Sequence, residues 1–234
     1  HTKKNIIIIS GAGVSTNAGI PDYRSSSRSK SSSHIVYDAS AYSTVESADR
    51  LHTDILHKLQ SGQEARITQF DTFAERLAQS NHLQSHYTQN IDCRQLKLPH
   101  LSKKTIWLHG RADTLVCHLR PSHTIKVTPQ SFLQLVKATC PTCEKEQSDR
   151  ASAHKRRRAM GFLRSNVLLY GENSPNEASI TATFNHDIAQ PVDAVLIVGT
   201  RLSIPSLAGF AKRLCRVVRE SSPDNLVIWV SKEP

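Results

Sequence analysis

The chain has no long hydrophobic run and no cysteine pattern of a secreted protein. None of its apolar runs approaches the about 18 residues of a membrane-spanning helix, so we expect no membrane span and no membrane partner. No secretory signal pattern opens the sequence, since the apolar run Ile6–Ile9 is too short. The five cysteines are an odd number, and Cys140 and Cys143 have metal-ligand spacing rather than that of a disulfide framework. We therefore expect a reducing compartment, the nucleus or the cytoplasm.

Acidic residues are scarce relative to basic ones. There are 20 Asp and Glu against 30 Lys and Arg, which gives a net charge of +10 and a pI of about 9.6. This balance favours anionic partners, such as nucleic acid, chromatin or a phosphorylated cofactor, although solubility alone would also explain it. The densest basic run, His154–Arg158, indicates either a solvated face or a patch for nuclear localisation or non-specific nucleic-acid contact. No aromatic residue interleaves this run, so sequence-specific recognition of single strands is not supported.

A glycine turn follows the first predicted strand. Ile6–Ile9 is a β-branched apolar run typical of a buried strand, and Gly11 and Gly13 come shortly after it. Glycines let a backbone approach an anion, and Ser15–Asn17 offers residues that cap helices, so the stretch has features of a phosphate-binding turn. The third glycine of the dinucleotide fingerprint is missing, because position 16 is Thr. The pattern leaves nucleotide binding and a tight strand–helix turn both open.

The residues after this turn favour the nucleotide site. Asp22, Tyr23 and Arg24 place a carboxylate, an aromatic ring and a guanidinium beside it, and a purely structural turn needs none of these groups. The following segment, Arg24–Ser33, has little apolar content and predicts a mobile loop.

Polar residues also follow other predicted strands. The pairs of strand and following residues are Leu83–Thr88 with Gln89–Asp92, Thr105–Leu108 with His109 and Gly110, and Asp193–Val198 with Gly199–Arg201. Helical patterns alternate with these strands, which indicates an α/β doubly wound parallel sheet that binds ligands at the carboxyl ends of its strands. The alternative to ligand binding for residues 89–92 is that they only form an Asn/Asp turn. A near-neutral imidazole such as that of His109 suits general-base work.

Several other elements follow from local pattern. Helical spacing of Leu51, Ile55 and Leu59 predicts a helix over 48–60 that Gly62 ends, with His52 on its solvated side. The remaining predicted elements are helices at 68–79, 178–189 and 206–219, a buried strand with a polar turn within 166–172, and a last strand at 226–230.

Residues 110–165 differ in character, with short strand-like segments and cysteines. The pair Cys140–Cys143 has the spacing of a zinc knuckle, and Cys117 supplies a third thiolate. A second pair is absent because position 120 is Arg, so the fourth ligand is His118 or His123, or the site is degraded. His123 is better placed, since adjacent residues chelate one ion poorly. The predicted ligands of a structural Zn²⁺ are therefore Cys117, His123, Cys140 and Cys143.

Three motifs together resemble one known family. The stretch GAGVSTNAGIPDYRS, residues 11–25, is similar to the signature of the sirtuins, the NAD-dependent protein-lysine deacylases. Thr88–Asp92 and Leu108–Gly110 match further sirtuin motifs in order and spacing, and the similarity runs from about residue 5 to residue 232. The resemblance implies a Rossmann-like NAD-binding domain from residues 1–109 and 166–234, a small zinc-binding module inserted at 110–165, and a helical and flexible-loop segment after the signature.

The resemblance also implies roles for individual residues. His109 is the expected catalytic base, Asn90 the group that positions the attacking water or ribose, and Asp92 the group that holds the nicotinamide carboxamide. The expected NAD-binding residues are Gly11, Ala12, Gly13, Ser15, Ile20, Asp22, Tyr23, Arg24, Gln89, Asn90, Ile91, Asp92, Gly199, Thr200, Arg201 and Ser231. The acyl-lysine substrate is expected at Leu168, Tyr170 and Gly171.

The sequence departs from the sirtuin pattern at a few of these positions. Tyr23 stands where many members have Phe, Arg201 where many have Ser, and Ser231 where many have Asn. Gly commonly follows the Asp of the second motif, and here Cys93 and Arg94 follow it.

The implied function is NAD-dependent deacetylation of protein lysine, in which the acetyl group passes to ADP-ribose and nicotinamide is released. The stretches 90–94 and 168–173 are most similar to the fungal nuclear sirtuins that act on histone H3. The expected partner is thus acetylated histone H3 or another acetyl-lysine protein, in the nucleus. Two alternatives are a chromatin-associated NAD or ADP-ribose sensor without turnover and a mono-ADP-ribosyltransferase.

Overall fold

The computed structural model of the chain describes residues 3–20 and 36–231. The predicted mobile loop at 24–33 lies outside these ranges, as do Asp22, Tyr23 and Arg24. None of the helices in the described ranges is both long and apolar enough to cross a membrane.

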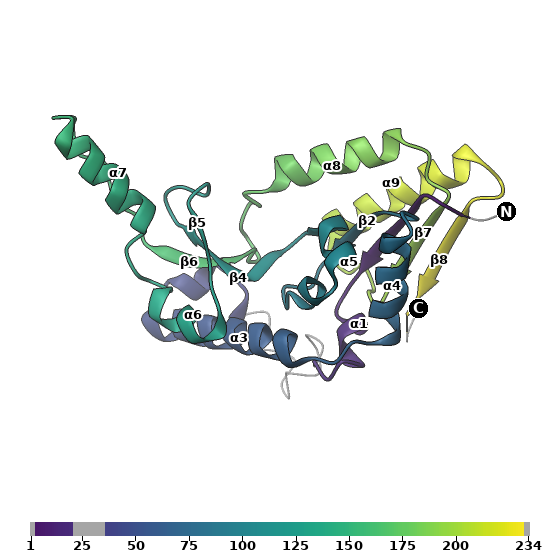
Figure 1. Cartoon of the computed structure of the whole chain (residues 1–234), viewed down its shortest axis with the longest axis horizontal. Helices are drawn as coiled ribbons and strands as arrows, with labels where there is room; N and C mark the ends of the chain where they lie inside the picture. Colours follow the sequence, from purple (N-terminus) through teal and green to yellow (C-terminus); the bar gives the residue numbers. More distant parts are fainter. Residues whose placement is uncertain (1–2, 21–35, 232–234) are drawn as a thin grey trace.

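A five-stranded parallel sheet forms the larger part of the fold (Figure 1). Its strand order is β3 (Thr105–Trp107), β2 (Leu83–Thr88), β1 (Ile6–Ser10), β7 (Ala194–Val198) and β8 (Leu226–Val230). Each neighbouring pair is parallel. The predicted strands at 83–88 and 226–230 have the observed bounds. The second is a run of β-branched and aromatic residues, which favours a strand.

Helices cover both faces of this sheet, which confirms the doubly wound prediction. The helices on one face are α8 (Glu177–Ala189) and α9 (Pro205–Ser221), and those on the other are α4 (Gln69–Gln79) and α5 (Pro99–Lys104). Side chains alternate along a strand, so Ile7 and Ile9 pack with the first pair of helices and Ile6 and Ile8 with the second. A strand buried on both faces reads as a continuous apolar run, as β1 does.

A second core surrounds a three-stranded antiparallel sheet of order β5–β4–β6. Its strands are β4 (Gly110–Cys117), β5 (Thr124–Lys126) and β6 (Leu163–Val167). The helical elements around it are η1 (Ala39–Tyr42), α3 (Val45–Glu64), α6 (Pro129–Leu135) and α7 (Pro141–Ser152), of which α7 projects away from the body (Figure 1). The domain boundaries expected from the sequence, which put the inserted module at 110–165, stay a prediction. The apolar face of α3 packs into this second core, through Leu51, Ile55 and Leu59.

Three local predictions were wrong. The strand expected within 166–172 is β6, which ends at Val167, pairs with β4 and buries only alternate residues, so it shows no continuous apolar run. The helix α3 continues through Gly62 to Glu64, because tertiary packing overrides the weak helix propensity of one glycine. His52 is 1% exposed rather than solvated, since it packs edge-on against Phe132 in the second core.

A histidine in β2 is buried among hydroxyl groups in the middle of the parallel sheet. The ring nitrogens of His86 lie 2.7 Å from Ser10 Oγ and 3.0 Å from Thr105 Oγ1. Its side chain is fully buried, and this burial lowers the pKa of His86 to about 3, with a further lowering from the Arg94 charge. His86 is therefore neutral at neutral pH.

We expect His86 to make the fold sensitive to acid. The unfolded chain binds a proton at His86 below its ordinary pKa of about 6.5, whereas the folded chain does so only near pKa 3. The free energy of unfolding should thus fall with decreasing pH through this window, by at most about 1.4 kcal/mol per pH unit from this group. Urea unfolding at about pH 7 and about pH 5 measures the slope.

The matched variants are His86→Gln, which keeps polar contacts but cannot titrate, and His57→Gln on the exposed side of α3. The first should have a shallower pH dependence than the native chain and the second the same dependence. Parallel slopes in all three proteins would contradict the assignment.

Candidate functional site

The candidate site lies at the carboxyl ends of the parallel strands. Gly11 follows β1, Gln89 follows β2, Gly199 follows β7 and Ser231 follows β8, while His109 comes two residues after β3. Backbone hydrogen bonds join these ends, from Gly11 N–H to the Val198 carbonyl and from Gly199 N–H to the Val230 carbonyl. In the sheet, β2 and β3 lie on one side of β1, and β7 and β8 lie on its other side, so the strand order reverses at β1. Open α/β sheets bind ligands in the crevice at such a reversal of strand order.

The glycines of the first turn permit contact with the second turn. A Cβ atom at Gly11 would lie 2.7 Å from Thr200 Cβ, and one at Gly13 would lie 2.7 Å from Gly199 Cα. The Gly13 N–H donates to the Gly199 carbonyl at 2.9 Å. Gly199 itself has φ +65°, in the region that favours glycine. These glycines are thus required by turn–turn packing, in addition to any ligand.

The predicted capping role of the hydroxyl residues is wrong. The helix after the turn, α1 (Gly13–Thr16), is a single turn whose N-cap is Ala12, with no side-chain cap. Thr16 donates back to the Gly13 carbonyl, and Ser15 turns inward, toward the loop after β2. Ser15 therefore belongs to the site and not to the helix start.

Ser15, Asn90 and Asp92 form one buried polar cluster. The Ser15 hydroxyl donates to Asp92 Oδ2 at 2.8 Å, and the Asn90 amide donates to Ser15 Oγ and to the Gly11 carbonyl, both at 3.0 Å. Asn90 is 9% and Asp92 4% exposed. The cluster joins the two sequence motifs across 75 residues of chain, from residue 15 to residue 90.

His109 is held in one tautomer next to this loop. Its Nδ1–H donates to the Gln89 carbonyl at 3.2 Å, which leaves Nε2 with a free lone pair to accept a proton. Burial lowers the pKa of His109 below its ordinary value of 6.5, and the Gln89 hydrogen bond opposes this shift. The imidazole is accordingly neutral at neutral pH.

The second glycine turn is tied to the same loop. Gln89 Nε2 donates to Thr200 Oγ1 at 2.8 Å, and that oxygen also accepts from the Leu202 N–H at 3.1 Å. The Trp229 indole donates to the Thr200 carbonyl at 3.0 Å. Thr200 is buried whereas Arg201 is exposed, and Ser231 is half-buried. The Thr200 hydroxyl oxygen thus accepts from two protein groups, which leaves its O–H to act as a donor.

Of the expected substrate residues, Leu168 lies beside His109. The Leu168 N–H donates to the His109 carbonyl at 3.0 Å, and a groove of about 320 Å³ adjoins Leu168 and Gly110. The Tyr170 backbone is already paired, since its N–H donates to the Tyr37 carbonyl and its carbonyl accepts from the Ala39 N–H. Of the other expected NAD positions, Ile20 is buried and Ile91 half-buried, with the Ile91 carbonyl accepting from Ala112 N–H.

The four predicted metal ligands converge in the second unit. The ligand atoms of Cys117, His123, Cys140 and Cys143 all lie within 4.8 Å of one another. The Cys117 and Cys143 sulfurs are 3.7 Å apart, and His123 Nδ1 lies 3.6 Å from Cys140 Sγ and 3.5 Å from Cys143 Sγ. A tetrahedral Zn²⁺ with ordinary bond lengths has S–S edges of about 3.8 Å and S–N edges of about 3.6 Å. The cluster fits a structural zinc ion.

The surroundings of the cluster also suit zinc. His123 Nε2 lies 3.1 Å from Glu146 Oε1, a carboxylate partner of the kind that orients metal-bound histidines. Arg120 donates to Cys143 Sγ at 2.9 Å, so the residue that replaces a second C-x-x-C cysteine bonds a thiolate instead. His118 stacks on Phe162 with ring centroids 3.7 Å apart and lies outside the group of four.

Sequence reasoning missed residues that support the site from a distance. A Cβ atom at Gly62 of α3 would overlap the Asp92 carbonyl oxygen, so only glycine lets α3 lie against this loop. The buried ion pair between Arg94 and Asp71 lies next to the same loop. A glycine inside a helical pattern was the signal for Gly62; no local pattern pointed to the ion pair.

Comparison with known proteins identifies the family. A family model described as the Sir2 family matches residues 11–206. The chain belongs to the Sir2 family. Its relatives include the NAD-dependent protein deacetylase hst4 of Schizosaccharomyces pombe, 33% identical over 97% of this chain and 59% of that protein. The protein of the same name from Emericella nidulans is 31% identical over 99% of this chain and 42% of that protein.

A third Sir2-family relative is the NAD-dependent histone deacetylase HST4 of Saccharomyces cerevisiae, 30% identical over 91% of this chain and 62% of that protein. The chain thus spans about half the length of these relatives, between 42% and 62%. A solved structure of a Sir2 homologue in complex with NAD shares the fold, with a TM-score of 0.71 and 19% identity over 97% of this chain and 77% of that chain. The predicted family and fold class are confirmed.

Gly62 offers a direct test of how the site loop is held. Gly62→Ala should destabilise the Sir2-family chain by about 1–3 kcal/mol, because α3 or the Asp92 backbone must move to admit a methyl group. Gly209→Ala in α9 is the matched control, since a Cβ there meets nothing within 4 Å. It should stabilise the chain by about 0.5–1 kcal/mol through helix propensity. Equal effects of the two substitutions in urea unfolding would refute the packing argument.

Proposed function

We propose that the chain is an NAD-dependent protein-lysine deacetylase. The observation that carries the proposal is the neutral His109 imidazole, with a free Nε2, beside the Ser15–Asn90–Asp92 cluster at the crevice of the sheet. The relatives from S. pombe and S. cerevisiae bear the names of NAD-dependent deacetylases, which supports the same activity here.

The proposed chemistry uses NAD as a co-substrate. NAD would supply the ribose carbon that accepts the acetyl oxygen as nicotinamide leaves. A ribose hydroxyl would then add to the acetyl carbon, and water would release the free lysine amine and leave the acetyl group on ADP-ribose. His109 Nε2 removes a proton from a ribose hydroxyl. The Asn90 amide nitrogen is committed to Gly11 and Ser15, so its Oδ1 is the atom that would orient the water or the ribose. The Asp92 carboxylate would accept hydrogen bonds from the carboxamide.

The finer proposals concern binding and place of action. Gly11–Gly13 and Gly199–Arg201 would contact the remainder of NAD, with Arg201 and Ser231 on the adenosine side. Asp22, Tyr23 and Arg24 are proposed as NAD-binding residues on the sirtuin resemblance alone. Leu168, Tyr170 and Gly171 would line the path of the acyl-lysine stem. An acetylated histone is the proposed substrate, because HST4 of S. cerevisiae is named a histone deacetylase. The choice of histone H3 and of the nucleus rests on the resemblance of residues 90–94 and 168–173 to the fungal nuclear sirtuins.

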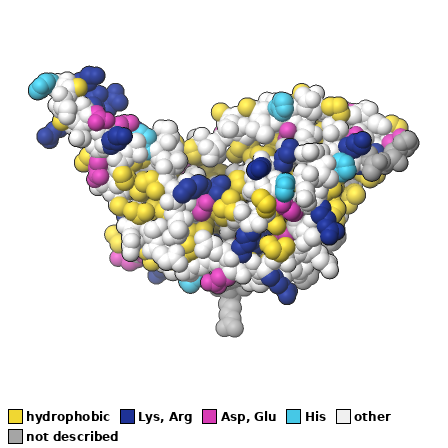
Figure 2. Space-filling view, in the orientation of Figure 1, with side chains coloured by type: hydrophobic (Ala, Val, Ile, Leu, Met, Phe, Trp, Pro, Cys, Tyr) yellow, Lys and Arg dark blue, Asp and Glu magenta, His cyan; other side chains and the backbone are white. Residues whose placement is uncertain are grey.

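The basic run on the projecting arm is a proposed contact for nucleic acid or chromatin. Residues 151–160 are all exposed, and Figure 2 shows Lys and Arg side chains gathered on the arm that α7 forms. Phosphate contact of this kind is independent of base sequence and weakens with salt. It would add affinity for a nucleosomal substrate without a role in the chemistry.

The alternatives are an NAD or ADP-ribose sensor and a mono-ADP-ribosyltransferase. Arg201 and Ser231 motivate the sensor, because they replace residues that many sirtuins place near the adenosine. The assembled His109, Asn90 and Asp92 favour turnover. Product analysis separates the alternatives, since only deacetylation removes the acetyl mass from the peptide.

The first prediction of the proposed function concerns His109. His109→Ala should lower the rate at which an acetylated histone H3 peptide is deacetylated by about 10²-fold or more, the usual contribution of a general base. The exposed His57→Ala should leave the rate unchanged. The base must be neutral, so activity should fall with acid only below the ordinary pKa of 6.5, since burial lowers the pKa of His109. Full deacetylation by His109→Ala would exclude it as the base.

A second prediction concerns the metal. We propose that Cys117, His123, Cys140 and Cys143 hold one structural Zn²⁺, which metal analysis of the purified chain should detect at one ion per chain. His123→Ala should lose zinc and melt at a lower temperature, whereas His123→Cys should retain it. His118→Ala is the control and should retain zinc, because His118 lies outside the group of four. Loss of zinc in His118→Ala but not in His123→Ala would reverse the ligand assignment.

A further inference from the structure

A buried arginine connects the site loop to the start of a helix on the sheet. The Arg94 guanidinium donates to both oxygens of Asp71, with Nη1 2.7 Å from Oδ2 and Nη2 2.9 Å from Oδ1. Nη2 also donates to the Val14 carbonyl of α1 at 3.3 Å. Arg94 and Asp71 are each 2% exposed. Few arginines are buried so completely, and a buried pair contributes little net stability, so its presence calls for another explanation.

The Asp71 end of this contact is fixed by the helix that carries it. Asp71 is the third residue of α4, and its Oδ2 accepts from the N–H and the hydroxyl of the N-cap Thr68, each at 2.8 Å. The Thr68 hydroxyl accepts from the Asp71 N–H in return. This reciprocal capping box holds the carboxylate in one orientation before Arg94 meets it.

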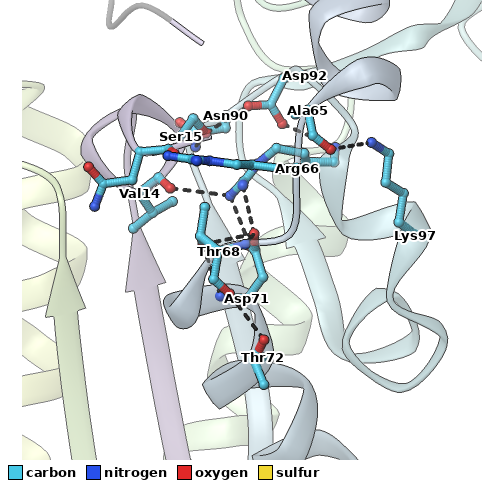
Figure 3. A network of polar contacts seen from close by, with 12 residues as sticks. Val14, Ser15, Ala65, Arg66, Thr68, Asp71, Thr72, Asn90, Asp92 and Lys97 are labelled. Atoms are coloured by element: carbon cyan, nitrogen blue, oxygen red, sulfur yellow. Dashed lines mark hydrogen bonds and ion pairs between the residues drawn. The ribbon is translucent and has the colours of Figure 1, made fainter. Parts of the chain in front are cut away.

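The Arg94 end leads directly into the proposed catalytic cluster. The Arg94 N–H donates to Asp92 Oδ1 at 3.2 Å, and Asp92 Oδ2 accepts from Ser15. Cys93 between them has φ +59°, a strained conformation for a residue other than glycine. Figure 3 shows Ser15, Asn90 and Asp92 on one side of the network and Thr68 with Asp71 on the other.

We propose that Arg94 is a positioning residue that holds Asp92 and the first turn of α1 in register for the nicotinamide end of NAD. Its guanidinium bonds α4 and α1 at once, and its backbone N–H orients Asp92. Loss of the guanidinium contacts with Asp71 and Val14 would free the strained turn at Cys93 and let Asp92 and Ser15 separate. This inference rests on the proposed function, because the readout is an NAD-dependent reaction.

The test compares variants that separate the charge of the Arg94–Asp71 pair, its hydrogen-bond geometry and the stability of the fold. Arg94→Lys keeps the charge but replaces the planar guanidinium by a single nitrogen, which cannot reproduce the bidentate contact with Asp71. Arg94→Met with Asp71→Asn removes both charges, so no unpaired charge stays buried, and the side-chain oxygen of the introduced asparagine still accepts from Thr68. Arg66→Met is the matched control, because exposed Arg66 also donates to a carbonyl near α1, that of Asn17.

For each variant we would measure the melting temperature, KM for NAD, kcat, and inhibition by the product nicotinamide. In the double variant and in Arg94→Lys we expect a melting temperature near that of the native chain. We also expect kcat/KM for NAD to be at least tenfold lower, and a higher nicotinamide concentration for half-inhibition. KM for the acetylated peptide should be unchanged, and Arg66→Met should match the native chain in every readout.

Two results would overturn the inference. One is a stable Arg94 variant with native values for kcat, KM for NAD and nicotinamide inhibition. The other is a loss of activity that follows the melting temperature alone across the series, since this is what a merely structural role predicts. Absence of nicotinamide release by the native chain would instead refute the proposed function, which distinguishes the two failures.

Discussion

The two glycine turns at the carboxyl ends of β1 and β7 lie against each other with no side chain between them. The Gly13 N–H bonds the Gly199 carbonyl, and the missing Cβ atoms at Gly11 and Gly13 leave room for Thr200 and Gly199. This contact holds the two turns together where strand order reverses. Any larger residue would separate the turns, and the groups of both turns would no longer face one ligand.

Everything else in the site is built outward from that contact by buried polar groups. Gln89 reaches the second turn through Thr200, and Asn90 reaches the first through the Gly11 carbonyl. Buried amides and carboxylates cost free energy unless they are hydrogen-bonded, so each of these bonds disfavours other arrangements of the loop. His109 is oriented by the same loop, through the Gln89 carbonyl. The result is a base and a carboxylate whose orientations are set by hydrogen bonds to other groups of the protein.

The second unit depends on a different kind of constraint. Its core is an antiparallel sheet of three strands packed on α3 and α6, and Cys140 and Cys143 are part of that core. A tetrahedral ion at the Cys117–His123 group would join β4 to α7 and to the loop before β5. Small cores of this size commonly rely on a structural metal. The helix α3 packs in this second core and also lies against Asp92 at Gly62, so it joins the second core to the site loop.

The sequence by itself determined the elements whose signals are local. The apolar run before Gly11 defined a doubly buried strand, and the polar residues after the predicted strands Leu83–Thr88 and Thr105–Leu108 marked the edge of the sheet where we expect a ligand. The C-x-x-C spacing, with Cys117 and His123, predicted the group of four side chains that the structure brings together. Strand β6 was misplaced because only alternate residues are buried, and α3 was cut short because a single glycine is a weak signal against tertiary packing.

Only the tertiary structure decided which distant groups meet. Asp71 and Arg94 are 23 residues apart, and Gly62 opposes Asp92 from another unit of the fold. Periodicity and spacing report the environment of a residue along its own element. The pairing of two elements depends on how their faces pack, and that is a property of the folded chain as a whole.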